Sequence, residues 1–170
     1  MRVLPSVSKL GGASAGAWET HRRGSERQMR FYIASSIANG RKAAALAEVL
    51  KSRGHEQTYD NRVFFDDVSK EGISGMSEAA FNGLRSVRDA ELVVVLLPGG
   101  SSTHTELGLA IATRGNKRII LWSERWEDFD FNEHTCVFYF HPCIERVVCT
   151  FEQLLQKLDT EQIGSDISHA

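Results

Sequence analysis

The carboxylate most suited to chemistry in this sequence is Glu106, which follows a Gly/Ser-rich turn over 98–103 and an apolar run over 91–97. An apolar strand, such a turn and then a helix place backbone amides at the carboxyl edge of an open α/β sheet, where ligands bind and helix N-termini attract anions. We expect this helix to begin at Thr103, which puts Glu106 in its first turn. A structural alternative is that Glu106 only assists helix capping, with Thr103 as the cap.

Further polar side chains follow two other expected strands. Ser35 ends the first strand and Asn39 follows it, and Tyr59 and Asp60 lie at the end of the second. Because the carboxyl ends of parallel strands share one edge of a sheet, these side chains are expected to gather with Glu106 around one small-ligand crevice.

The apolar pattern predicts the elements that position these residues. The expected strands are 30–35, 55–59, 91–97, 117–122 and 136–140, and the expected helices are 41–53, 76–90, 103–114 and 150–158. Strands that alternate with helices form right-handed crossovers and a parallel sheet. We therefore expect an α/β fold with a single doubly wound, mostly parallel five-stranded sheet flanked by helices, Rossmann-like or flavodoxin-like.

The regular pattern also divides the chain. One α/β domain is expected over 29–160, after a disordered leader over 1–28 and before a flexible tail over 161–170. In the helix over 76–90, the inward-facing side chains are expected to be Ala79, Ala80, Leu84 and Val87.

Four aromatic side chains lie in and after the fourth expected strand: Trp122, Trp126, Phe129 and Phe131. We interpret them as core and lid packing. The alternative is a subunit interface or a flap over the ligand.

Composition limits the partners. The chain has 170 residues, 25% of them charged, and a formal net charge of −2. This charge gives no footprint for a nucleic-acid polymer or an anionic membrane, and no apolar run is long enough to span a bilayer. Three cysteines without an apolar signal segment favour reduced thiols and a cytoplasmic location.

No cofactor or metal is expected. Neither the GxGxxG pattern of dinucleotide sites nor a Walker lysine motif is present. Cys136, Cys143 and Cys149 lie near His134 and His141, but their spacing lacks the pattern of a closed metal site.

Taken in order, several segments resemble the nucleoside 2-deoxyribosyltransferase family between residue 29 and about residue 158. They are Ala34-Ser-Ser36, Arg53-Gly-His55, Thr58-Tyr-Asp60, Ala90-Glu-Leu-Val-Val-Val-Leu-Leu-Pro-Gly-Gly100 and Thr103-His-Thr-Glu-Leu-Gly-Leu-Ala110. The resemblance implies a nucleoside or nucleotide as the small-molecule partner, and a homodimer or a higher homo-oligomer.

The same resemblance implies a role for Glu106 as the nucleophile that attacks the anomeric carbon of the sugar. Such a carboxylate is what an oxocarbenium-like transition state needs on the face opposite the leaving base, and a covalent intermediate divides one difficult displacement into two. A helix N-terminus would also favour the ionised carboxylate. Water or a second base would then take the sugar.

The sequence departs from the family's transferases in the turn before this glutamate. Those enzymes carry acids there that hold the sugar 5′-hydroxyl, whereas this chain has Gly99, Gly100, Ser101 and Ser102. Relatives that hydrolyse deoxynucleoside 5′-monophosphates have a neutral Ser/Gly turn. We therefore expect Gly100, Ser101, Ser102 and Thr103 to bind a ligand, with a 5′-phosphate as the favoured group; a merely flexible turn is the alternative.

The second departure concerns the leaving base. The family's transferases carry an acid in the helix before the third strand, but 79–82 contains none. Asp60 and Asp89 are the candidate substitutes, Tyr59 is placed to stack on a base, and His104 is a candidate proton shuttle or a cover for the turn. Two other functions therefore stay open: a non-catalytic nucleotide-binding module of the same fold, and an NAD glycohydrolase.

Overall fold

The computed structural model describes residues 27–60, 72–131 and 135–160. The expected leader up to residue 26, the expected tail and most of the connection after Asp60 lie outside these residues. The predicted division of the chain at those places stays a prediction.

The described strands form one sheet in which every pair of neighbours is parallel. The strands are β1 (Arg30–Ser35), β2 (Glu56–Gln57), β3 (Leu92–Leu96), β4 (Arg118–Ser123) and β5 (Ile144–Val148). Their spatial order is β2-β1-β3-β4-β5, which is the order of flavodoxin-like doubly wound folds. The expected fold class is confirmed.

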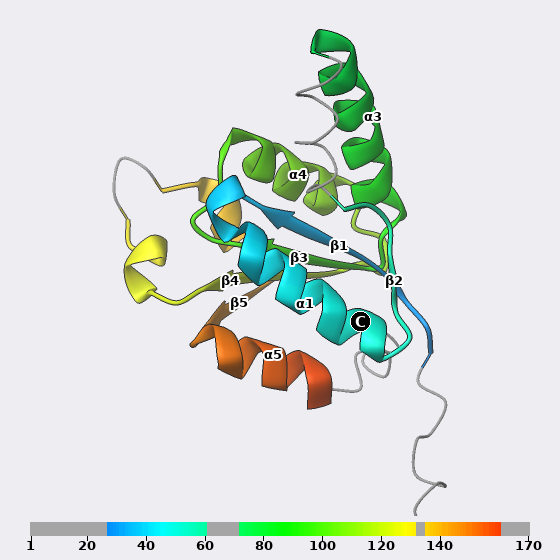
Figure 1. Cartoon of the computed structure of the whole chain (residues 1–170). Coiled ribbons are helices and arrows are strands. Elements are labelled where there is room, and N and C mark those ends of the chain that lie inside the picture. Colours follow the sequence, from blue (N-terminus) through cyan, green and yellow to red (C-terminus); the bar gives the residue numbers. More distant parts are fainter. Residues whose placement is uncertain (1–26, 61–71, 132–134, 161–170) are drawn as a thin grey trace, which may run out of the picture.

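Helices cover both faces of this sheet. The helices are α1 (Gly40–Ser52), α3 (Ile73–Asp89), α4 (Ser101–Ala112) and α5 (Phe151–Thr160), with short 3-10 helices η1 (Ile37–Asn39), η2 (Trp126–Phe129) and η3 (Val137–Phe140). Helices α1 and α5 pack on one face, and α3 and α4 on the other (Figure 1). The three 3-10 helices lie at the end to which the strands point, at the left of Figure 1.

Alternate side chains of β1 pack into the cores on the two faces of the sheet. Phe31 and Ile33 belong to the core under α1 and α5, whereas Tyr32 and Ala34 belong to the core under α3 and α4. Strand β3, in the centre of the sheet, is buried along its whole length, as its unbroken apolar run predicts for a strand covered on both faces.

The prediction of a fifth strand over 136–140 is wrong. Residues Val137–Phe140 form η3, and β5 is formed by Ile144–Val148 at the edge of the sheet. Only Tyr139 of the η3 residues is buried, so the β-favouring composition of that segment does not correspond to a half-buried strand surface. Strand β5 is partly exposed and carries Glu145 and Arg146, which weakens its apolar pattern but suits an edge strand.

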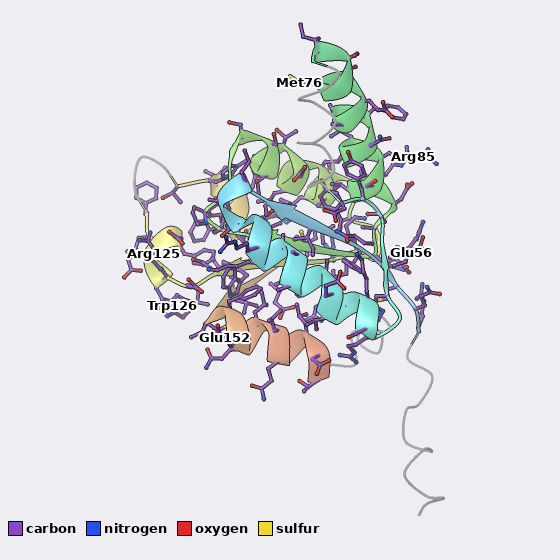
Figure 2. The ribbon with its side chains drawn as sticks, viewed as in Figure 1. Glu56, Met76, Arg85, Arg125, Trp126 and Glu152 are labelled. Carbon is purple, nitrogen blue, oxygen red and sulfur yellow. The ribbon has the colours of Figure 1, made fainter. Side chains whose placement is uncertain are left out.

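The prediction of which side chains face inward from the helix over 76–90, which corresponds to α3, is also partly wrong. Val87 is buried, but Ala80 is exposed and Leu84 is 45% exposed. The N-terminal half of α3 extends beyond the sheet in Figure 1, and Met76 lies near its tip in Figure 2. The other buried residues of this helix are small, among them Gly83 and Ser86.

The four aromatic side chains in and after β4 do not behave alike. Trp122 is fully buried, and Phe129 packs partly buried against the core under α3 and α4. Trp126 and Phe131 are 71% and 98% exposed, which corrects the expectation that all four pack in a core or lid.

None of the helices within the described ranges combines the length and the apolar character that crossing a membrane requires.

Candidate functional site

The strand order β2-β1-β3-β4-β5 makes the carboxyl ends of β1 and β3, where the chain's crossovers diverge, the expected position of the ligand crevice. The segments after these two strands are joined directly. Ser36 Oγ donates a hydrogen bond to the Pro98 carbonyl at 3.0 Å, and Asn39 Nδ2 lies 3.3 Å from the carbonyl oxygens of Leu96 and Pro98. The buried Asn39 amide thus holds the floor of the crevice, while Ser35 ends β1 opposite Leu96. Their predicted ligand contacts stay predictions.

A tyrosine–glutamate pair lies on the α3/α4 side of this crevice. Tyr32 Oη donates to Glu106 Oε1 at 2.7 Å, from a tyrosine that is fully buried in β1. A buried tyrosine hydroxyl needs a polar partner, and a partly buried carboxylate gains a fixed orientation from this bond. The pair joins strand β1 to helix α4.

The position of Glu106 within its helix differs from the expectation. Helix α4 begins at Ser101, with Gly100 as the N-cap residue and no acid in the first turn. Glu106 therefore lies in the second turn, and Thr103 is inside the helix and not its cap. Because the helix-dipole effect falls off within the first turn, the expectation that the helix N-terminus stabilises the ionised carboxylate is wrong. Tyr32 is a contact that orients this group.

Helix α3 passes beside the pair at Gly83. A Cβ atom added there would lie 3.7 Å from Tyr32 Oη and 3.9 Å from Glu106 Oε1. These are ordinary contact distances, so the position faces the pair and presents no side chain to it. This part of α3 therefore supplies no acid beside Glu106.

The turn before α4 is closely built. Gly100 N–H donates to Thr103 Oγ1 at 3.2 Å, and Thr103 is buried. A Cβ at Gly99 would lie 2.9 Å from Thr103 Cγ2, so glycine is required there. The side chains of Ser101 and Ser102 are exposed. The turn is therefore ordered by its own contacts, with two hydroxyls and the first amides of α4 at its surface.

His104 links this turn to η3. Its Nδ1 lies 2.7 Å from the Gly100 carbonyl oxygen, and its Nε2 lies 2.7 Å from Tyr139 Oη. Burial, with smaller contributions from Cys136 and Asp128, raises the pKa of Tyr139 to about 12. Tyr139 consequently keeps its proton at neutral pH and is able to donate it to the ring of His104.

The remaining acid and base candidates lie in different places. Tyr59 packs partly buried against the core under α3 and α4, and Asp60 follows it beyond β2. Asp89 ends α3 and precedes β3, so it lies at the opposite, amino end of the strands. The hydrogen bond from Arg88, at 2.9 Å, and the charges of nearby arginines lower the pKa of Asp89, as in a structural ion pair. The structure thus leaves Asp89 away from the candidate site, and the predicted role of Asp60 stays a prediction.

Metal-ligating residues do not gather among the described residues: no group of three His, Cys, Asp or Glu side chains is placed to hold an ion. The nearest approach to such a group is a pair, His141 Nδ1 and Cys143 Sγ, 3.0 Å apart.

The sequence does not single out two tyrosines of this region as site residues. Tyr32 stands in a strand pattern and Tyr139 in a segment of apolar residues, so both fit a core. The available signal is that a buried tyrosine requires a partner for its hydroxyl. That signal predicts a partner without naming it, because Glu106 and His104 are far away in sequence.

Comparison with known proteins agrees with this class of fold. No protein-family model and no curated protein matches the chain. Among solved structures, the chain is similar to the CMP N-glycosidase BcmB of Clostridium botulinum, with a TM-score of 0.54 and 18% sequence identity over 76% of this chain and 98% of that one. The fold therefore resembles that of an N-glycosidase enzyme.

Proposed function

We propose that this protein cleaves or transfers the N-glycosidic bond of a nucleoside or deoxynucleoside 5′-monophosphate, with Glu106 as the nucleophile. The observation that carries the proposal is the 2.7 Å hydrogen bond between Tyr32 in β1 and Glu106 in α4, the helix that follows the Gly/Ser-rich turn. It gives a buried tyrosine a catalytic purpose that core packing alone does not explain.

The chemistry is a double displacement. A carboxylate oxygen of Glu106 attacks the anomeric carbon, the C–N bond breaks, and the base leaves with the bonding electrons and takes a proton. Water then attacks the glycosyl ester and restores the carboxylate, or a second base accepts the sugar. Tyr32 orients the carboxylate throughout and limits its rotation, which lowers the entropic part of the barrier.

The N-terminus of α4 is suited to the 5′-phosphate. The first amides of a helix lack intrahelical acceptors and point toward an incoming anion, and Ser101 and Ser102 add exposed hydroxyls. Ser102 and Glu106 are four residues apart on one helix face, a rise of about 6 Å. This separation is comparable to that between the 5′-phosphate and the anomeric carbon of one nucleotide, so both ends of the sugar would contact the same helix.

Similarity to a structure described as a CMP N-glycosidase supports two parts of the proposal: that the bond cleaved is N-glycosidic, and that the substrate is a nucleotide. The name of that protein specifies CMP. We leave the base and the sugar of the substrate of this chain to experiment.

A non-catalytic nucleotide-binding module is the second candidate, and one observation favours it. The α3 position that faces Tyr32 and Glu106 is Gly83, which supplies no acid for the leaving base. Asp60, which follows β2, is the residue proposed to supply that proton, and its loss separates the two candidates.

The test is base release, followed by chromatography, from a panel of nucleosides, deoxynucleosides, their 5′-monophosphates and NAD, with and without a second base. Glu106→Gln is expected to abolish release, and Asp60→Asn to slow it. Glu152→Gln is the matched control, because Glu152 is exposed on α5 across the sheet (Figure 2). Tight binding of a monophosphate by the wild type without turnover would establish the binding module instead. Release from NAD alone would establish a glycohydrolase.

A further inference from the structure

Tyr139 is the one buried residue of η3. It is 7% exposed, whereas Val137, Phe138 and Phe140 in the same short helix are between 46% and 74% exposed. The ring lies edge-on to Phe129, with centroids 6.1 Å apart. A segment that is otherwise exposed therefore turns one hydroxyl toward the turn before α4.

The hydrogen-bond directions along this contact follow from elementary chemistry. The Gly100 carbonyl only accepts, so Nδ1 of a neutral His104 ring must carry the proton at 2.7 Å from it. Nε2 is then an acceptor, and Tyr139 Oη, 2.7 Å away, donates to it. With the pKa of Tyr139 raised to about 12 by burial, the donor is protonated throughout the neutral range.

Gly100 is held on both sides as a result. Its carbonyl accepts from the backbone N–H of His104 at 3.1 Å as well as from the ring, and its own N–H donates to Thr103 Oγ1. A Cβ added at the adjoining Gly99 would lie 3.5 Å from His104 Cε1 and nearer still to Thr103, so both side chains pack against this glycine. The His104 ring therefore contacts both glycines of the turn.

We propose that Tyr139 is a positioning residue that acts through His104 to hold the Gly99–Gly100 turn in the shape that receives the substrate's 5′-phosphate. This inference rests on the proposed function. It assigns His104 to the same positioning chain, because both of its ring nitrogens are engaged, and leaves the proton of the departing base to another group. Tyr139 does not touch the reacting atoms, so its effect falls on phosphate recognition and not on the bond-breaking step.

The kinetic test is Tyr139→Phe, which keeps the ring and its packing against Phe129. We expect KM for the preferred 5′-monophosphate to rise about 5- to 20-fold, as for loss of one buried hydrogen bond, with kcat changed less than about 2-fold. The same substitution should leave the kcat/KM for the corresponding nucleoside nearly unchanged. Val137→Ala, in the exposed part of the same 3-10 helix, is the matched control and should alter neither substrate.

A double-mutant cycle tests the route through His104. The side-chain amide introduced by His104→Asn reaches the position of ring Nδ1 but not that of Nε2, so it can retain the bond to Gly100 and must lose the bond to Tyr139. In this background Tyr139→Phe is expected to add nothing to KM. Independent, additive effects of the two substitutions would overturn the positioning chain.

A readout that needs no activity is the ring tautomer of His104, from ¹H–¹⁵N correlation spectra of the ligand-free protein at about pH 8. The wild type should show the Nδ1–H tautomer, and Tyr139→Phe should shift the ring toward a mixture. A wild-type ring protonated on Nε2 would overturn the positioning chain whatever the enzyme does. If the wild type shows the Nδ1–H tautomer but neither binds nor turns over a monophosphate, the proposed function fails and the phosphate role of Tyr139 with it. If the wild type acts on monophosphates and Tyr139→Phe leaves KM unchanged, the inference alone fails.

Discussion

The two faces of this sheet receive alternate residues of the same strand and use them differently. Under α1 and α5, β1 supplies Phe31 and Ile33, whose side chains carry no polar group into the core. Under α3 and α4, the same strand supplies Tyr32, whose hydroxyl is bonded to Glu106. The second face contains both tyrosine-centred contacts of the candidate site. Side chains of β1 on one face thus only pack, while a side chain on the other face also holds a polar group in place.

The largest expected effect is that of Glu106→Gln. The substitution keeps the size of the side chain and an acceptor for Tyr32, but it removes the nucleophilic carboxylate. We expect kcat to fall on the order of 10³-fold or more, as when a covalent catalyst is removed, with the thermal midpoint close to that of the wild type. Steady-state kinetics and a thermal melt check this. A variant that melts normally and retains a tenth of the activity would contradict it.

The opposite pattern is expected on the other face. Leu46 of α1 is fully buried against the sheet. Leu46→Ala should lower the free energy of unfolding by about 2–5 kcal/mol through lost burial and the cavity left behind. Denaturant titration measures this loss. The kcat/KM of the remaining folded protein should stay within about 2-fold of the wild type; a large selective loss of activity would show that the two faces are not separable.

Tyr32→Phe sharpens the comparison within β1. It removes one hydroxyl and leaves the ring in the core, so Glu106 loses its orienting donor. We expect kcat to fall about 10-fold and the free energy of unfolding to fall by about 1 kcal/mol. The control is Phe31→Leu in the neighbouring position of the same strand, which should affect stability alone. Equal losses of kcat in both variants would remove the special role of the hydroxyl.

Two adjacent glycines test how closely the turn is built. Gly99→Ala forces a methyl group against Thr103 and is expected to raise KM for a monophosphate about 5- to 10-fold, with a loss of about 1–3 kcal/mol in stability from overpacking. Gly100 has an extended backbone, with φ −100° and ψ −175°, and open space around an added Cβ. Gly100→Ala should therefore keep the wild-type stability. The measurement is the free energy of unfolding of the two variants, and a reversed order would contradict the geometry of the turn.

The smallest effect is a pH dependence at the alkaline limit. Burial raises the pKa of Tyr139 to about 12, above the value of about 10 for an unfolded tyrosine. The folded state then holds this proton more tightly, so its contribution to stability is complete below about pH 10 and is lost as the pH rises toward 12. In urea titrations the wild type should lose more stability across this range than Tyr139→Phe. An equal loss in both would mean that Tyr139 titrates as an exposed tyrosine.

The sequence predicted the centre of the fold better than its edges. The run over 92–96 is short and contains three β-branched valines, which favours a strand, and its lack of alternation indicates burial on both faces. The edge strand Ile144–Val148 was missed because half-exposed positions tolerate charges such as Glu145, which bonds to Arg118 at 2.6 Å. The segment Val137–Phe140 has the composition of a strand, but it forms a 3-10 helix with a single buried side chain.

The site divides in the same way. Glu106 and the turn before it are local in sequence, so the residue types and their order are enough to single them out as site candidates. The partners that hold them, Tyr32 and Tyr139, are brought in by β1 and η3 from 74 and 35 residues away. Such partners depend on strand order and on which face a residue occupies, which are properties of the folded chain.

The most direct test of the central claim is a search for the glycosyl ester on Glu106. Wild-type protein would be mixed with its preferred deoxynucleoside 5′-monophosphate, quenched in acid within the first turnover, digested and analysed by mass spectrometry. We expect a sugar-phosphate adduct on the peptide that contains Glu106, formed as the base is released and absent in Glu106→Gln. Rapid base release without any adduct, together with release by Glu106→Gln at the wild-type rate, would contradict it.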